Sequence, residues 1–173
     1  LTAEAIDKDG WFHTGDIGEW KEQNGNKFLK ITDRKKELFK TAGGKYVAPQ
    51  VIENKMKESP YIEQIMIVGD DNKKFVSALI VPSFQEVENW AKSQNLSFAN
   101  SEAMVKDAKV IALLQQEINK FNVDFGKWEQ VKKFVLLPKE WTVESGELTP
   151  TMKPKRKVVN EVYKAAIESM YQV

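Results

Sequence analysis

The sequence predicts an α+β fold in which a small, mainly antiparallel sheet is flanked by helices and preceded by a β-hairpin. The apolar runs 62–68 and 75–81 have the length and the Ile, Val and Leu content of buried strands. Apolar residues recur at helical spacing over 106–122 and again from about residue 155 onward. Asn24-Gly25 is a tight-turn signal that favours a hairpin over 20–31. Strands and helices in this order indicate a sheet packed against helices.

The remaining elements follow from turn and capping residues. Four are expected: a second hairpin over 37–47, a helix from Pro49 to about Ser59, a helix over 84–93 and a strand over 131–137. For the helix at 84–93, Ser83 and Glu86 form a capping-box pattern, which predicts a side-chain cap at its first turn.

Composition excludes several classes of function. Lys and Arg number 26 against 25 Asp and Glu, so charge gives no reason to expect a nucleic-acid partner. The absence of cysteine removes disulfides and thiolate chemistry, and a single histidine, His13, argues against a metal site. No apolar run approaches the roughly 20 residues of a membrane span. We expect a cytoplasmic protein, with peripheral membrane association left open, and, from the start at Leu1, a fragment of a longer chain.

Two polar segments near the amino terminus could bind a nucleotide. In Trp11-Phe12-His13-Thr14-Gly15-Asp16, a carboxylate on a glycine turn can accept hydrogen bonds from the two hydroxyls of a ribose, although Asp16 can equally be a simple turn former. The charged run Asp33-Arg34-Lys35-Lys36-Glu37 is either solvated surface or a hinge, because it separates two hairpins. Arg34 is also suited to donate to a ribose or phosphate.

The third segment is Lys40-Thr41-Ala42-Gly43-Gly44-Lys45-Tyr46. It departs from a phosphate-binding P-loop, because Phe39 and Tyr46 stand where that pattern needs Gly and Ser or Thr. A hairpin turn is one interpretation. The other is that Gly43 and Gly44 let a thin chain such as pantetheine pass against bare backbone.

The fourth segment is Gly146-Glu147-Leu148-Thr149-Pro150-Thr151-Met152-Lys153-Pro154-Lys155-Arg156. Pro154 disfavours helix at the residue before it, so Lys153 is expected on a loop just ahead of a helix. Any one lysine among 26 basic residues can be plain surface. A compact cation on a loop is nevertheless suited to bridging a carboxylate and a phosphate.

Taken together and in this order, the segments GWFHTGD, TDRKKELFKTAGGKYVAP and GELTPTMKPKR resemble the adenylate-forming superfamily of acyl-CoA synthetases, luciferases and peptide-synthetase adenylation domains. The Thr-Pro-Thr-Met-Lys form and the long helical segment 84–122 resemble the long-chain fatty acyl-CoA synthetases. The resemblance implies that residues 1–32 are the tail of a large amino-terminal adenylation domain. Residues 33–173 would then be the mobile carboxyl-terminal domain.

The same resemblance implies a role for each site residue. Lys153 would be catalytic, Asp16 and Arg34 would bind the nucleotide, and Lys36 or Asp33 would be the hinge. Residues Gly43, Gly44 and Lys45 would line the CoA path. The parent enzyme would join a fatty acid to ATP and then to CoA, with Mg²⁺ bound mainly by the missing domain. The fragment alone would be inactive. Two alternatives stay open: a CoA ligase for another carboxylic acid, and a non-catalytic stand-alone binding module.

Overall fold

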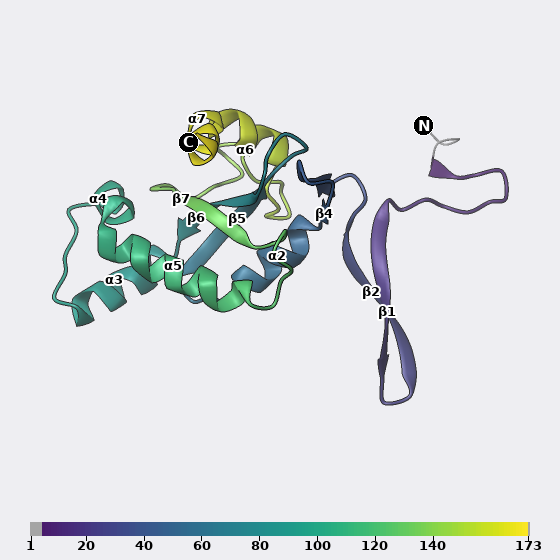
Figure 1. The fold of residues 1–173 in the computed structure, drawn as a ribbon, viewed down its shortest axis with the longest axis horizontal. Helices are drawn as coiled ribbons and strands as arrows, with labels where there is room; N and C mark the ends of the chain where they lie inside the picture. Colours follow the sequence, from purple (N-terminus) through teal and green to yellow (C-terminus); the bar gives the residue numbers. More distant parts are fainter. Residues whose placement is uncertain (1–4, 173) are drawn as a thin grey trace.

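A three-stranded sheet forms the centre of the structure, a computed structural model that describes residues 5–172. Its strands lie in the order β5 (Ile62–Val68), β6 (Val76–Pro82) and β7 (Val131–Leu136). A second unit, the hairpin of β1 (Asp16–Gln23) and β2 (Asn26–Arg34), stands away from this body as an arm (Figure 1). The short hairpin of β3 (Phe39–Lys40) and β4 (Tyr46–Val47) lies between them.

Both faces of the central sheet are buried, and successive side chains along each strand enter different cores. Ile65 and Ile67 of β5 belong to one apolar cluster, whereas Met66 and Val68 belong to the other. This alternation is the period of two that a strand imposes. A continuous apolar run is therefore needed where helices cover both faces.

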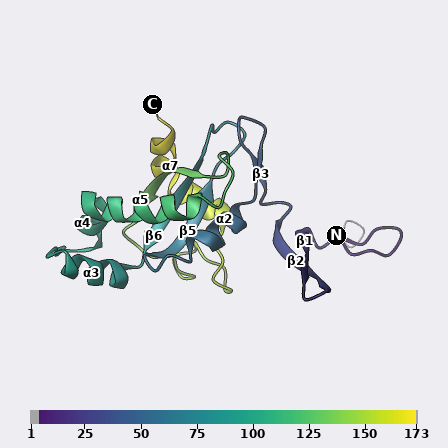
Figure 2. The ribbon, with the colours of Figure 1, turned by 60° about the horizontal axis from the view of Figure 1, so that its bottom comes forward.

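Helices supply the partners of the two faces. One face packs against α2 (Pro49–Met56), α3 (Phe84–Ser93), α4 (Ser101–Lys106) and α5 (Ala108–Asn122). The other packs against α6 (Arg156–Val162) and α7 (Lys164–Tyr171). In Figure 2, α3 and α5 lie together and α7 stands apart from them across the sheet. The α+β fold with a small sheet flanked by helices is confirmed.

The pairing of strands is mostly antiparallel, as predicted, with one exception. Strand β5 pairs antiparallel with β6, and both hairpins are antiparallel. Strand β7 instead runs parallel to β6. A parallel neighbour needs a long crossover, and the segment carrying α3, α4 and α5 provides it.

The helix predicted over 106–122 is present as α5, and the Asp107 carboxylate caps its first turn by accepting from Lys109 N and Val110 N. The short helix α4 before it was not predicted. Two other local predictions were wrong. The terminal helix is interrupted at Tyr163. Helix α3 is where it was predicted, but the Ser83 side chain makes no cap hydrogen bond there.

The arm is longer than the predicted hairpin. Its strands pair from Asp16 opposite Arg34 to Gln23 opposite Asn26. Asn24 and Gly25 form the turn with φ of 53° and 76°, the left-handed region that Asn and Gly tolerate best. The arm therefore begins and ends with two of the residues singled out for nucleotide binding.

Candidate functional site

Asp16 and Arg34 lie side by side at the base of the arm. They are cross-strand partners, and Arg34 Nε is 3.7 Å from Asp16 Oδ1. Gly15, with φ 76°, turns the chain into β1, and the Thr14 hydroxyl accepts a hydrogen bond from Asp16 N. Both side chains keep contact with solvent, so a carboxylate acceptor and a guanidinium donor are presented together at one edge.

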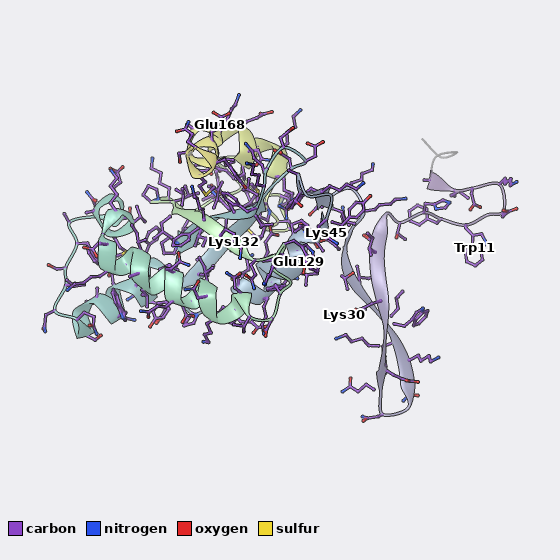
Figure 3. The ribbon with its side chains drawn as sticks, viewed as in Figure 1. Trp11, Lys30, Lys45, Glu129, Lys132 and Glu168 are labelled. Carbon is purple, nitrogen blue, oxygen red and sulfur yellow. The ribbon has the colours of Figure 1, made fainter. Side chains whose placement is uncertain are left out.

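His13 belongs to a separate turn rather than to this pair. His13 Nε2 lies 3.1 Å from Asp7 Oδ2. The backbone N–H of Trp11 and the His13 ring both bond the Asp7 carboxylate, and the pKa of Asp7 is lowered, chiefly by the Trp11 N–H. The Asp7–His13 contact organises the loop before the arm. Figure 3 shows Trp11 on that loop, pointing away from the body.

Asp33 joins the arm to the body. Its side chain is only 1% exposed, and its carboxylate accepts hydrogen bonds from Arg34 N at 2.6 Å and from Gln50 N at 3.3 Å. Gln50 N is one of the unpaired donors of the first turn of α2, so Asp33 caps that helix from outside. Burial raises the pKa of Asp33 above its ordinary value.

The exposed part of the charged run is only a few residues long. Arg34, Lys35 and Lys36 are exposed, whereas Asp33 is buried and Glu37 is half-buried. Glu37 Oε2 accepts from Gln50 Nε2 at 2.9 Å. Lys36 therefore sits in a turn between two side chains that are held to the same helix.

The glycine turn is open on its outer side. Gly44 has φ 74° and its N–H bonds to Thr41 O, while Ala42 N bonds to Lys73 O and fastens the turn to the body. A Cβ added at Gly43 would meet only Thr41 Oγ1, at 3.8 Å, and one added at Gly44 would meet nothing within 4 Å. The pair thus leaves a strip of backbone accessible.

Trp128 was missed by the sequence analysis and lies beside this turn. Lys45 Nζ is 5.4 Å from the centre of the Trp128 ring, a cation–π distance. The ring covers Gly126, where a Cβ would come within 2.9 Å of it. Figure 3 labels Lys45 and Glu129 on the side of the body that faces the arm. In the sequence, Trp128 is an aromatic residue that follows Gly126-Lys127 in a polar stretch, and this is the signal that could have identified it.

Lys153 lies on a closed loop, as predicted. Leu148 and Pro154 form an isolated antiparallel bridge, and Thr149 N bonds to Lys153 O at 2.8 Å. Thr149 Oγ1 in turn accepts from Lys153 N at 3.0 Å, while Met152 takes φ 61° at the tip. The Leu148 side chain is buried and anchors the loop in the core. The backbone at Lys153 is therefore fixed, while its side chain is exposed.

Arg156, three residues after Lys153, is the centre of a buried ionic network that the sequence analysis did not foresee. Its guanidinium contacts the carboxylates of Glu37 and Glu53 and the carbonyl of Ile67. Within residues 5–172, no hydrogen bond or ion pair joins Lys153 to Asp16 or Arg34. The structure thus brings Asp16 to Arg34, and Glu37 of the charged run to the stem of the Lys153 loop, but it does not bring these two groups into contact.

Two further findings bear on the site. The described part of the chain holds no group of three or more His, Cys, Asp or Glu side chains that could bind a metal ion. In residues 5–172 no helix is long and apolar enough to span a bilayer.

Comparison with known proteins decides the family. The profile of the AMP-binding enzyme C-terminal domain matches residues 37–173. The chain belongs to this family. It is 42% identical over 172 residues to the long-chain-fatty-acid–CoA ligase FadD15 of Mycobacterium tuberculosis, covering 98% of this chain and 28% of that protein. It is 38% identical over 172 residues to human long-chain-fatty-acid–CoA ligase 1, covering 98% of this chain and 24% of that one.

A solved structure agrees with this family. The adenylation domain of a carboxylate reductase from Mycobacterium chelonae superposes with a TM-score of 0.78 at 27% identity, covering 98% of this chain and 24% of that one. This member of the AMP-binding C-terminal family therefore matches the carboxyl-terminal part of long-chain fatty acid–CoA ligases. It spans about a quarter of the length of the relatives it matches.

Proposed function

We propose that the chain is the mobile carboxyl-terminal part of an ATP-dependent, AMP-forming long-chain fatty acid–CoA ligase. The observation that carries the proposal is the Lys153 loop, which presents an exposed lysine from a backbone closed by the Leu148–Pro154 bridge. That loop occurs in a chain 42% identical to the corresponding part of a long-chain-fatty-acid–CoA ligase. A substrate carboxylate and an α-phosphate are the groups such a cation would bridge.

In the first half-reaction, a carboxylate oxygen of the fatty acid attacks the α-phosphorus of ATP, and pyrophosphate leaves. Lys153, a cation at neutral pH, offsets the negative charge that gathers between the two reacting anions. Asp16 accepts from the ribose hydroxyls and Arg34 donates to the nucleotide, which fits their position side by side at the base of the arm. For Asp16 and Arg34 to make these contacts, ATP must bind beside the base of the arm.

In the second half-reaction, the CoA thiol attacks the acyl carbonyl, and AMP leaves. We assign the pivot between the two steps to Lys36, an exposed residue in the turn between Asp33 and Glu37. Rotation there would release the Asp33 cap on α2, while Glu37 stays bonded to that helix. After rotation, the open strip at Gly43 and Gly44 would let the pantetheine chain pass against backbone. Lys45, beside Trp128, would lie near the CoA nucleotide.

The arm fits a role as an edge of a larger amino-terminal domain, with the boundary near residue 32. It is a two-stranded hairpin, which is marginally stable alone, and it exposes many large apolar side chains. The exposed apolar side chains of the arm are Trp20, Phe28, Leu29 and Ile31, and the loop before the arm adds Trp11 and Phe12. The acyl pocket and the Mg²⁺ that accompanies ATP are assigned to that larger domain, and peripheral attachment to a membrane would belong there too.

A panel of acids tests the substrate class. The full-length protein is incubated with ATP, CoA and fatty acids of increasing length, or with aromatic and short-chain acids, and AMP and acyl-CoA are measured. The proposal predicts AMP and thioester in equal amounts, with the highest kcat/KM for long-chain fatty acids. A preference for an aromatic or short-chain acid would favour the alternative ligase. No AMP with any acid would favour the non-catalytic binding module. The isolated 173-residue chain is predicted to form no thioester.

A further inference from the structure

Arg156 connects the hinge to the stem of the catalytic loop. It is the first residue of α6, and its side chain is 23% exposed. Its Nε lies 3.1 Å from Glu37 Oε2, its Nη2 lies 2.6 Å from Glu53 Oε1, and its Nη1 donates to Ile67 O at 3.1 Å. One guanidinium thus contacts the residue after the proposed pivot, helix α2 and strand β5.

The partners of Arg156 are themselves fixed. Glu37 Oε2 also accepts from Gln50 Nε2 at 2.9 Å, and Glu53 Oε1 accepts from Ile67 N at 2.7 Å. Each acceptor therefore has a second donor, and the fork of N–H groups on Arg156 is held in one orientation. Arginine is suited to such a node, because its donors are planar and always charged.

The network lies at the base of the Lys153 loop. Lys155 N bonds to Glu147 O at 2.7 Å, which closes the two stems of the loop directly beside Arg156. A cleft of about 940 Å³ borders the same region, and its lining includes Lys36, Glu37, Lys155 and Arg156. The hinge and the catalytic loop, more than a hundred residues apart in sequence, therefore share one wall of the body.

We infer that Arg156 is a positioning residue that fixes the Lys153 loop to Glu37, the residue that follows the proposed pivot Lys36. The inference rests on the proposed function of Lys153. A rotation at Lys36 would move Glu37, Arg156 and the loop as one unit, so that the angle of the hinge sets the position of the Lys153 amine. Loss of the Arg156–Glu37 contact would displace the glycine turn less than the Lys153 loop, because the hydrogen bond from Ala42 N to Lys73 O holds that turn to the body.

Glu37→Gln in the full-length enzyme is the most selective test. It removes the one charge of the network that is adjacent to Lys36 but leaves the bonds from Arg156 to Glu53 and Ile67 in place, so the fold should survive. The first half-reaction is measured by ATP–pyrophosphate exchange, and the second from supplied acyl-AMP and CoA. We expect kcat of the first to fall about tenfold, as a small displacement of a reacting group produces, with KM for ATP unchanged. The second should stay within twofold.

Three further variants make the test decisive. Arg156→Lys, which keeps the charge but loses the fork, should show the same selective loss. Glu161→Gln is the matched control, because Glu161 is exposed on α6, lines the same cleft and forms no ion pair among the described residues. It should change neither half-reaction. Lys153→Ala tests the proposed function separately, since it should abolish the first half-reaction by itself.

The inference is overturned if Glu37→Gln and Arg156→Lys leave the first half-reaction within twofold while Lys153→Ala abolishes it. It is also overturned if the two network variants reduce both half-reactions equally, since a general loss of structure would do that. If Lys153→Ala leaves the first half-reaction intact, the proposed function itself fails.

Discussion

Arg156 Nη2 lies 2.6 Å from Glu53 Oε1, and the two residues come from helices separated by more than a hundred positions in sequence. Glu53 is 7% exposed, and it also accepts the backbone N–H of Ile67. The pair thus ties α6 to α2 and β5 at the point where the chain leaves the Lys153 loop. Burying charge raises the pKa of Glu53, and the guanidinium acts against that shift.

Arg156→Ala should strongly destabilise the protein. The substitution leaves the buried Glu53 carboxylate without its cation, and an unpaired buried charge costs roughly 3–5 kcal/mol. Urea unfolding of the 173-residue chain would measure this loss. Lys155→Ala, at the exposed neighbour, should change the free energy of unfolding by less than about 0.5 kcal/mol. Equal effects of the two substitutions would show that the network contributes little to stability.

Asp33→Asn should change how stability depends on pH. Burial, joined by the charge of Glu37, raises the pKa of Asp33 above 3.8, while the N–H groups of Arg34 and Gln50 and the charge of Arg156 oppose it. The folded state therefore holds the proton to a higher pH than the unfolded state. Stability from this group is fully present below pH 3.8 and is lost as the pH rises through the folded pKa.

Asparagine keeps an acceptor for Gln50 N but does not titrate. The free energy of unfolding of Asp33→Asn, minus that of the parent protein, should therefore increase as pH rises from 3.8 toward neutrality. Urea unfolding at a series of pH values measures the difference. A difference that stays constant, or one that decreases with pH, would contradict the assignment.

Gly43→Ala tests whether the glycine turn lines the CoA path, because this substitution should affect CoA binding much more than stability. The new methyl group would make only an ordinary contact with Thr41 Oγ1, so the free energy of unfolding should change by less than about 1 kcal/mol. In the full-length enzyme, KM for CoA should rise at least about tenfold if pantetheine passes against this backbone. Gly44→Ala, at φ 74°, should instead lose about 1 kcal/mol of stability. An unchanged KM for CoA with Gly43→Ala would remove the turn from the CoA path.

Lys36→Pro tests the pivot. The backbone N–H of Lys36 makes no hydrogen bond within residues 5–172, but Lys36 is the third residue of the turn that Glu37 N closes on Arg34 O, and proline disfavours that turn. It also fixes φ near −65°, which should hinder rotation at that residue. Thioester formation from supplied acyl-AMP should fall more than ATP–pyrophosphate exchange, with Lys36→Ala as the control that keeps the torsion free. The opposite order would exclude Lys36 as the pivot.

The sequence allowed prediction of those elements whose signal is local. The apolar runs at 62–68 and 75–81 became buried strands, and Asn24-Gly25 became the turn of the arm. Pro154 placed Lys153 on a loop before a helix, as its backbone restriction implies. In each case, residues close in sequence determine the conformation.

Features that depend on distant contacts could not be predicted. The parallel pairing of β7 with β6 is decided by how the crossover helices pack. The short helix α4, which ends just before the Asp107 cap of α5, carries too few residues for a helical period to be recognised. The contacts of Arg156 with Glu37 and Glu53 join three segments whose charges, taken singly, look like solvated surface.

The central claim is that Lys153 serves the first half-reaction alone, and Lys153→Ala in the full-length enzyme tests it most directly. ATP–pyrophosphate exchange with a long-chain fatty acid should fall to background, while thioester formation from supplied acyl-AMP should stay within about threefold of the parent rate. Lys155→Ala is the matched control, since its exposed side chain lies two positions away and only its backbone bonds to Glu147. Equal loss of both half-reactions, or exchange that survives the substitution, would contradict the account.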